Sequence, residues 1–101
     1  MPWWHYTTAD DIPDPHSLGI RSWLNGQIMQ NSNTSMMIFK LPELIRFLSH
    51  NCTLMPGDII LTGTPHGVGT FREPSIYMKD GDEVVVEIEK VGRLANICRT
   101  M

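Results

Sequence analysis

The sequence contains few of the features that define several large classes of protein. Only two of its 101 residues are cysteine, too few for a disulfide framework, and we expect both to be reduced thiols. No stretch approaches the roughly 20 apolar residues that cross a bilayer. The N-terminus also lacks the basic segment and apolar run of a secretory signal. These absences predict a cytoplasmic protein without a membrane partner.

An excess of positive charge is missing as well. Eight Lys and Arg against eleven Asp and Glu give a formal net charge of −3, which offers no field to attract a polyanion. We therefore expect no nucleic-acid partner. The hydrophobic fraction of 42% and the charged fraction of 19% are ordinary for folded proteins, so one small globular domain is expected.

Large aromatic residues stand at the start of the chain, where domains are usually polar. Trp3, Trp4 and Tyr6 ordinarily need a partner surface. Two interpretations stay open. These residues form a first strand that packs on the core, or the chain begins inside a domain and the rings pack on structure that precedes it.

A β-hairpin is predicted around Asn25-Gly26. This dipeptide supplies the two positive φ angles of a type I′ turn, and it joins the segments 19–24 and 27–30. Two-residue pairing sets Trp23 against Ile28, which is a favourable cross-strand contact.

A helix and several further strands follow. Pro42 opens a helix that runs to about residue 50, because proline is favoured in the first turn and Glu43 complements the helix dipole. Further strands are predicted at 58–62, 83–89 and 93–99, with a short buried run at 36–39. Five or six strands and one short helix predict a β-rich α+β fold.

The segment 57–69 is the most informative part of the chain. An apolar strand runs into a loop with two threonines, one proline and three glycines, which let backbone N–H groups approach an anion closely. Pro65 biases Thr64 toward extended geometry, so its hydroxyl and N–H can both donate to a carboxylate beside Gly63. Thr62 belongs to the same candidate group. The alternative is a tight loop whose threonines satisfy their own backbone.

The strand at 83–89 offers a second candidate site. Glu87 and Glu89, with Glu83 nearby, project to one face and so form a candidate chelating group for a divalent cation. Apolar residues alternate with them, however, which is typical of a half-buried antiparallel strand with one solvated face. We favour that interpretation, with a buried face made by Val84, Val86 and Ile88.

Other chemically reactive residues form weaker patterns. The four histidines lack the spacing of metal ligands, and only His66 lies in the glycine loop. A polar cluster of Asp10, Asp11, Asp14 and His16 is explained by loop solvation. No serine has a nucleophile-elbow context, and neither cysteine has an activating basic neighbour.

Taken together, these motifs resemble the bacterial-type fumarylacetoacetate hydrolase family. The segments that carry the resemblance occur in the family's order: Thr-Ala-Asp-Asp-Ile-Pro-Asp-Pro-His, Trp-Leu-Asn-Gly-Gln, Gln-Asn-Ser-Asn-Thr-Ser, Pro-Glu-Leu-Ile, Pro-Gly-Asp-Ile-Ile-Leu-Thr-Gly-Thr-Pro-His-Gly-Val-Gly, Gly-Asp-Glu-Val-Val-Val-Glu-Ile-Glu and Gly-Arg-Leu-Ala-Asn. They cover nearly the whole chain. The resemblance implies that residues 1–101 are the C-terminal portion of a catalytic domain with a β-roll or mixed β-sandwich fold.

The same resemblance implies an activity. Members act on small keto or enol acids, such as acylpyruvates or 2-hydroxyhepta-diene-dioates, by C–C hydrolysis, decarboxylation or isomerisation. A Mg²⁺ or Mn²⁺ ion chelates the carbonyl and carboxylate oxygens and stabilises the developing enolate. The resemblance also implies a homodimer in the full-length form.

The resemblance assigns substrate-binding residues but no metal ligand and no catalytic residue. The family's Glu-x-Glu pair, its Asp, its lysine and its His–Glu pair precede the segment that matches residues 3–16. Thr64 with Gly63 matches the position that binds the substrate carboxylate, whereas 87–89 matches a late structural strand. Two hypotheses remain, a portion of a metal-dependent enzyme or a non-catalytic β-domain that serves in binding or assembly.

Overall fold

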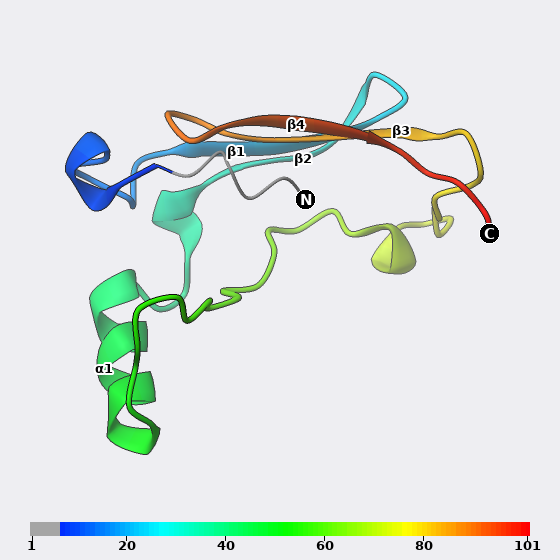
Figure 1. Ribbon diagram of the computed structural model, residues 1–101. Coiled ribbons are helices and arrows are strands. Elements are labelled where there is room, and N and C mark those ends of the chain that lie inside the picture. Colours follow the sequence, from blue (N-terminus) through cyan, green and yellow to red (C-terminus); the bar gives the residue numbers. More distant parts are fainter. Residues whose placement is uncertain (1–6) are drawn as a thin grey trace.

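The computed structural model describes residues 7–101, and its centre is one four-stranded antiparallel sheet (Figure 1). The strands lie in the order β2-β1-β3-β4, with bounds β1 (Gly19–Leu24), β2 (Gln27–Asn33), β3 (Glu83–Ile88) and β4 (Gly92–Ile97). Helix α1 (Leu41–Asn51) extends away from one end of the sheet. Single 3₁₀ turns occupy Ala9–Asp11, Thr34–Met36 and Gly69–Phe71.

The predicted β-rich α+β class is confirmed, but the number of strands was overestimated. The part of the chain that the structure describes has four strands rather than five or six. The strand suggested for Trp3–Tyr6 lies outside the described residues.

Local turn chemistry produces the first hairpin. Asn25 and Gly26 have φ angles of 51° and 82°, which are the positive values of the predicted type I′ turn. The register places Trp23 opposite Ile28, as predicted. The turn fixes the pairing next to it, so this part of the hairpin was predictable from the sequence. Beyond Trp23 the register shifts, and β2 continues to Asn33 rather than ending at residue 30.

The same turn connects the hairpin to a distant strand. The Asn25 amide donates to Asp82 Oδ1 at 2.9 Å, and the Glu83 N–H donates to Asn25 Oδ1 at 2.9 Å. The bond from Asn25, followed by one from the Lys79 backbone N–H, lowers the pKa of Asp82. These contacts hold the start of β3 beside the end of β1, where the two strands pair.

Helix α1 confirms the prediction for residues 42–50. Pro42 and Glu43 lie in its first turn, as the helix-start pattern requires. The first helical N–H, from Leu41, donates to His16 Nε2 at 3.0 Å. His16 therefore caps the helix, a role beyond the loop solvation that its sequence context indicated.

Two apolar runs behave differently from the predictions. The predicted strand at 58–62 is wrong, because this segment has no strand assignment and runs beside α1. Ile59 and Leu61 are 63% and 92% exposed. The run at 36–39 is exposed rather than buried, with Ile38 at 89%. An apolar pattern indicates a need for burial, whereas a strand also needs a neighbour that pairs its backbone groups.

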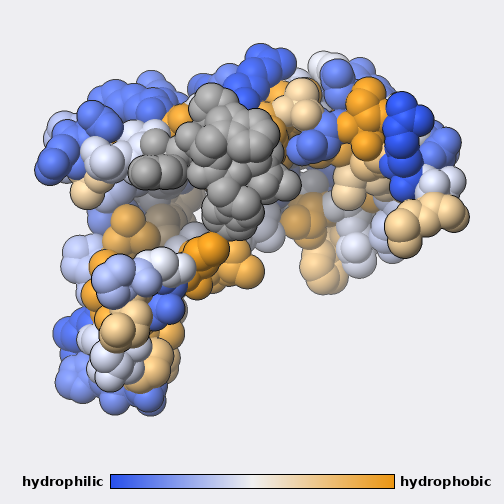
Figure 2. Space-filling model, in the orientation of Figure 1, coloured by the Kyte–Doolittle hydropathy of each residue, from blue (hydrophilic) through white to orange (hydrophobic). Residues whose placement is uncertain are grey.

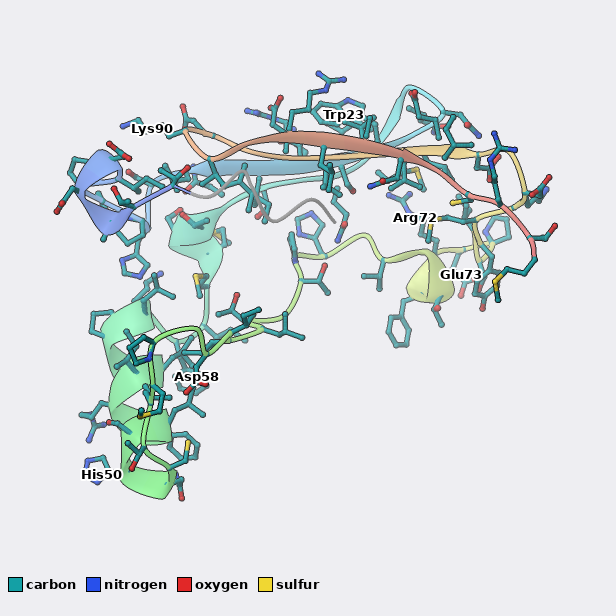
Figure 3. All side chains as sticks on the ribbon, in the orientation of Figure 1. Trp23, His50, Asp58, Arg72, Glu73 and Lys90 are labelled. Carbon is teal, nitrogen blue, oxygen red and sulfur yellow. The ribbon has the colours of Figure 1, made fainter. Side chains whose placement is uncertain are left out.

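The buried side of β3 is also different from the one predicted. Val85 is 4% exposed and lies on the face of Glu83 and Glu87, whereas Val86 on the other face is 43% exposed. The cause is the register, which sets Trp23 opposite Val85. Figure 3 shows Trp23 on the side of the sheet that faces away from α1.

Much of the apolar surface of the described residues remains open. Only Leu18 and Val85 form a buried apolar core there. Figure 2 shows apolar side chains at the surface near α1 and below the sheet, and the exposed set includes Phe47, Leu61 and Phe71. Apolar patches of this kind are typical of surfaces that contact other protein structure.

Candidate functional site

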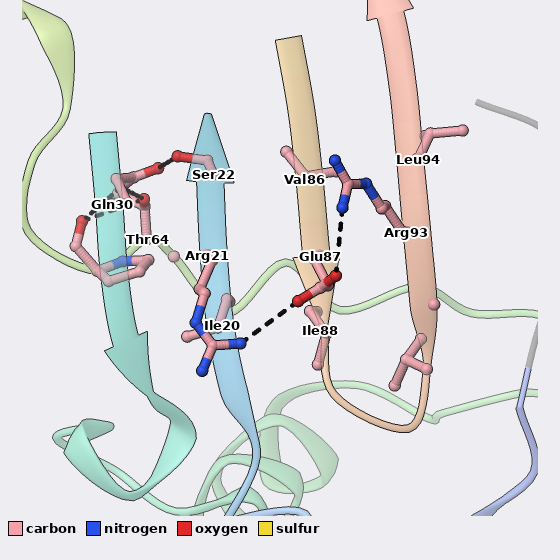
Figure 4. Close-up of a pocket in the computed structure, with 14 residues that line it drawn as sticks. Ile20, Arg21, Ser22, Gln30, Thr64, Val86, Glu87, Ile88, Arg93 and Leu94 are labelled. Carbon is pink, nitrogen blue, oxygen red and sulfur yellow. Dashed lines mark hydrogen bonds and ion pairs between the residues drawn. The ribbon is translucent and has the colours of Figure 1, made fainter. Parts of the chain in front are cut away.

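A hollow of about 560 Å³ lies between the sheet and the glycine loop (Figure 4). The loop residues 63–65 form one wall. The sheet contributes residues from all four strands, including Ile20, Ser22, Gln30, Val86, Ile88 and Leu94. A mainly apolar floor with a few polar groups at one wall is the usual composition of a small-molecule site.

Both predicted substrate-binding residues line this hollow. Gly63 has φ +92°, a left-handed conformation that favours glycine, and a Cβ built there would meet nothing within 4 Å. The wall beside Thr64 is therefore open enough for a ligand to approach the backbone. Thr62, which the sequence grouped with them, instead lines a second hollow between 58–62 and α1.

Gln30 on β2 holds the loop, and the sequence analysis did not identify it. Its Nε2 donates to Thr64 Oγ1 at 2.9 Å and to Pro65 O at 2.9 Å, with a longer contact of 3.4 Å to His66 O. On the other side, the Ser22 hydroxyl donates to Gln30 Oε1 at 3.0 Å. These contacts join β1, β2 and the loop into one hydrogen-bonded unit beside the hollow (Figure 4).

A β-bulge brings a second anchor to the loop. The register of β1 and β2 shifts between Ser22, which faces Gln30, and Trp23, which faces Ile28, so Met29 has no partner in β1. A bulged residue leaves its backbone groups available. Arg72 uses this vacancy, because its Nη2 donates to Met29 O while its Nε donates to Gly67 O at 3.0 Å.

Replacement of Gly67 by alanine is expected to push the loop away from β2. A Cβ at Gly67 would lie 2.6 Å from Met29 O, and its φ is +103°. Gly57→Ala is the matched control, since Gly57 has φ +95° but no atom within 4 Å of the added Cβ. Backbone strain of about 1–2 kcal/mol is common to both variants. We expect a larger loss of unfolding free energy for Gly67→Ala, measured by denaturant titration in a full-length enzyme that carries this segment; equal losses would contradict the close packing.

The alternative considered for Thr64, a hydroxyl that bonds the loop's own backbone, also has a counterpart in the structure. Its hydroxyl lies 3.2 Å from Pro65 O, within donor distance of its own neighbour's carbonyl. That carbonyl already accepts from Gln30 at the shorter distance of 2.9 Å. The hydroxyl proton thus has only a weak internal acceptor. His66 is not among the residues that line the hollow.

The glutamates of β3 do not fit a divalent cation. Glu87 contacts Arg21 at 3.3 Å and Arg93 at 3.9 Å, and it alternates along β3 with Val86, which pairs with Ser22. Glu89 Oε1 accepts the Gly19 N–H at 3.1 Å. Across residues 7–101, no group of three or more His, Cys, Asp or Glu could hold a metal ion. Both carboxylates are thus engaged within the sheet, Glu87 in ion pairs and Glu89 in a backbone hydrogen bond.

Comparison with known proteins identifies the family to which this chain belongs. The model of the fumarylacetoacetate (FAA) hydrolase C-terminal family matches residues 2–99. Oxaloacetate tautomerase FAHD2A, mitochondrial, from Bos taurus is 55% identical over 89 residues, which are 88% of this chain and 28% of that protein. A Dictyostelium discoideum homologue of fumarylacetoacetate hydrolase domain-containing protein 2 is 50% identical over 86% of this chain and 29% of its own length.

Solved structures agree on the fold. A putative HpcE protein from Mycobacterium smegmatis superimposes with a TM-score of 0.90 at 41% identity, over 93% of this chain and 35% of that one. Maleylpyruvate hydrolase from Sphingobium sp. SYK-6, in complex with manganese (II) ion and pyruvate, gives a TM-score of 0.81 at 40% identity. That match covers 90% of this chain and 32% of the hydrolase. This chain thus spans about a third or less of the relatives that it matches.

Proposed function

The chain belongs to the fumarylacetoacetate hydrolase family, and from that premise we propose that it supplies the carboxylate-binding wall of a metal-dependent enzyme acting on keto or enol acids. The observation that carries this proposal is the placement of the Thr64 hydroxyl beside Gly63 at the wall of the hollow. A hydroxyl held at an open glycine loop is suited to donate a charge-assisted hydrogen bond to a carboxylate.

For the reaction we propose keto–enol interconversion of oxaloacetate. The support is the 55% identity with a protein named oxaloacetate tautomerase. Interconversion of this kind moves a proton between carbon and oxygen and breaks no C–C bond, so the contribution of this chain is to fix the carboxylate while the proton moves. Hydrolysis of an acylpyruvate-type substrate is the second candidate, favoured by the maleylpyruvate hydrolase whose structure holds pyruvate.

A divalent cation, Mg²⁺ or Mn²⁺, is part of the proposal for the full-length form. Such an ion would polarise the substrate carbonyl and stabilise an enolate. The described residues contain no group of ligands that could hold such an ion. We propose that its ligands come from a further segment of the full-length form, one that corresponds to the part of the relatives that this chain does not span.

We propose a small keto or enol acid as the ligand, no nucleic-acid partner and a homodimer of the full-length form. None of the helices formed by residues 7–101 has the length and apolar character to cross a membrane. The cytoplasmic location remains a prediction, and the bovine relative is itself named as mitochondrial.

A segment exchange tests the proposed function. Residues 7–101 replace the matching segment of the bovine relative, and the chimera is assayed with Mg²⁺ or Mn²⁺ for loss of the enol absorbance of oxaloacetate. We expect metal-dependent tautomerisation within about tenfold of the unmodified enzyme. Cleavage of acylpyruvate without tautomerisation would favour the second candidate. A folded, metal-binding chimera with neither activity would support the alternative of a non-catalytic β-domain.

A further inference from the structure

The orientation of the Gln30 amide is fixed by its surroundings. Two backbone carbonyls, Pro65 O at 2.9 Å and His66 O at 3.4 Å, lie on the side assigned to Nε2. Carbonyl oxygens only accept hydrogen bonds, so the NH₂ group must be on this side and Oε1 on the other. The Ser22 hydroxyl then donates to Oε1 at 3.0 Å. A rotated amide would set three oxygens against one another.

This orientation determines what the Thr64 hydroxyl can do. Thr64 Oγ1 accepts an N–H from Gln30 at 2.9 Å. Its proton is then directed away from the amide, and its internal acceptor is Pro65 O at 3.2 Å, which Gln30 already occupies. A carboxylate oxygen is a stronger acceptor than this shared carbonyl.

We propose that Gln30 is a positioning residue that sets Thr64 as a hydrogen-bond donor toward the substrate carboxylate. The Ser22 hydroxyl fixes the orientation of the Gln30 amide, and the amide NH₂ donates to Thr64 Oγ1. The Thr64 hydroxyl proton then remains available to donate to the ligand. This inference rests on the proposed function of Thr64. It states that the direction in which the Thr64 hydroxyl donates is determined by Gln30, 34 positions away in the sequence. The bulge at Met29 places Gln30 opposite Ser22, as the arrangement requires.

Two replacements of similar length separate polarity from packing. Gln30→Met keeps the approximate volume but removes both hydrogen-bonding groups. Gln30→Glu keeps the shape, can only accept when ionised, and therefore forces the Thr64 hydroxyl to donate inward. Ser22→Ala removes only the donor to Oε1 and leaves the loop contacts in place, so it remains informative if either Gln30 variant folds poorly.

The experiment measures KM and kcat for oxaloacetate in the chimera, together with the thermal unfolding temperature of each variant. We expect Gln30→Met to raise KM about tenfold and Gln30→Glu to raise it by about a hundredfold, with kcat changed less than KM. Ser22→Ala should raise KM by a few fold. A purely structural role predicts instead a lower unfolding temperature, lowest for Gln30→Glu because its carboxylate would face Pro65 O and His66 O, with KM of the folded enzyme unchanged. That result would overturn the proposal.

A double-mutant cycle distinguishes failure of this inference from failure of the proposed function. In a Thr64→Val background the hydroxyl is gone, so Gln30→Met should raise KM by less than twofold further. If Thr64→Val alone leaves KM unchanged, the proposed carboxylate site is wrong. If Thr64→Val raises KM but Gln30→Met and Gln30→Glu do not, only the role of Gln30 is wrong. Full additivity of the two changes would also overturn the inference.

Discussion

The 101-residue chain alone should show no metal-dependent turnover of oxaloacetate or acylpyruvates. A metal ion that polarises a carbonyl contributes several kcal/mol of transition-state stabilisation, and the described residues supply no group of ligands that could hold one. Glu87 is already paired with Arg21 and Arg93, so its carboxylate is not free to substitute for the missing ligands. The substrate would meet the carboxylate-binding wall without the group that activates it.

The measurement is an assay of purified chain with Mg²⁺ or Mn²⁺, accompanied by calorimetric titration of the metal. A control with metal and substrate but no protein is essential, because divalent cations alone can promote reactions of oxaloacetate. Turnover above this control would contradict the expectation and require a metal site that the geometry does not contain. We also expect self-association in sedimentation velocity, since apolar residues such as Phe47, Leu61 and Phe71 are exposed.

Elements governed by neighbouring residues were predictable from the sequence. Asn25-Gly26 determines its hairpin because the turn needs two positive φ angles and the pairing follows from the turn. Helix α1 was predictable for a similar reason, since Pro42 and Glu43 mark its start within one turn. The strands at 83–88 and 92–97 follow from their alternating pattern and the turn between them.

Elements governed by distant residues were not predictable in the same way. The apolar residues Ile59 and Leu61 led to the prediction of a strand. A strand also needs a neighbouring strand that pairs its backbone groups, and no described segment provides one there. The buried face of β3 depends on its register with Trp23, about 60 positions earlier in the chain. Local sequence carries the conformational preference of a segment, whereas pairing and burial are decided by what lies beside it.

The residues of the candidate site also differ in whether local sequence or distant contacts reveal them. Gly63 and Thr64 stand out because a glycine loop after an apolar run is visible in the sequence. Gln30 does not, because its importance arises from contacts with Thr64 and Pro65 across the fold. The only sequence signal that bears on it is the hairpin register, and an unrecognised bulge at Met29 shifts that register by one residue.

Thr64→Val should weaken carboxylate binding in a full-length enzyme that carries this segment. The replacement keeps the branched shape and removes the hydroxyl, so it costs one charge-assisted hydrogen bond of roughly 1.5–3 kcal/mol. This corresponds to a rise in KM of about ten- to 150-fold. The change also leaves Gln30 Nε2 without one of its acceptors, although Pro65 O still accepts from it at 2.9 Å.

Two matched variants identify the hydroxyl at this position as the cause. Thr62→Val makes the same chemical change in a residue that lines the hollow beside α1, so it should leave KM within about twofold of the parent enzyme. Thr64→Ser keeps the hydroxyl and should restore most of the affinity. KM values and the inhibition constant of a simple carboxylate such as pyruvate report the same contact in two ways. If Thr64→Val and Thr62→Val gave equal kinetics, Thr64 would not belong to the site, because only one of the two hydroxyls lies at the wall of the sheet hollow.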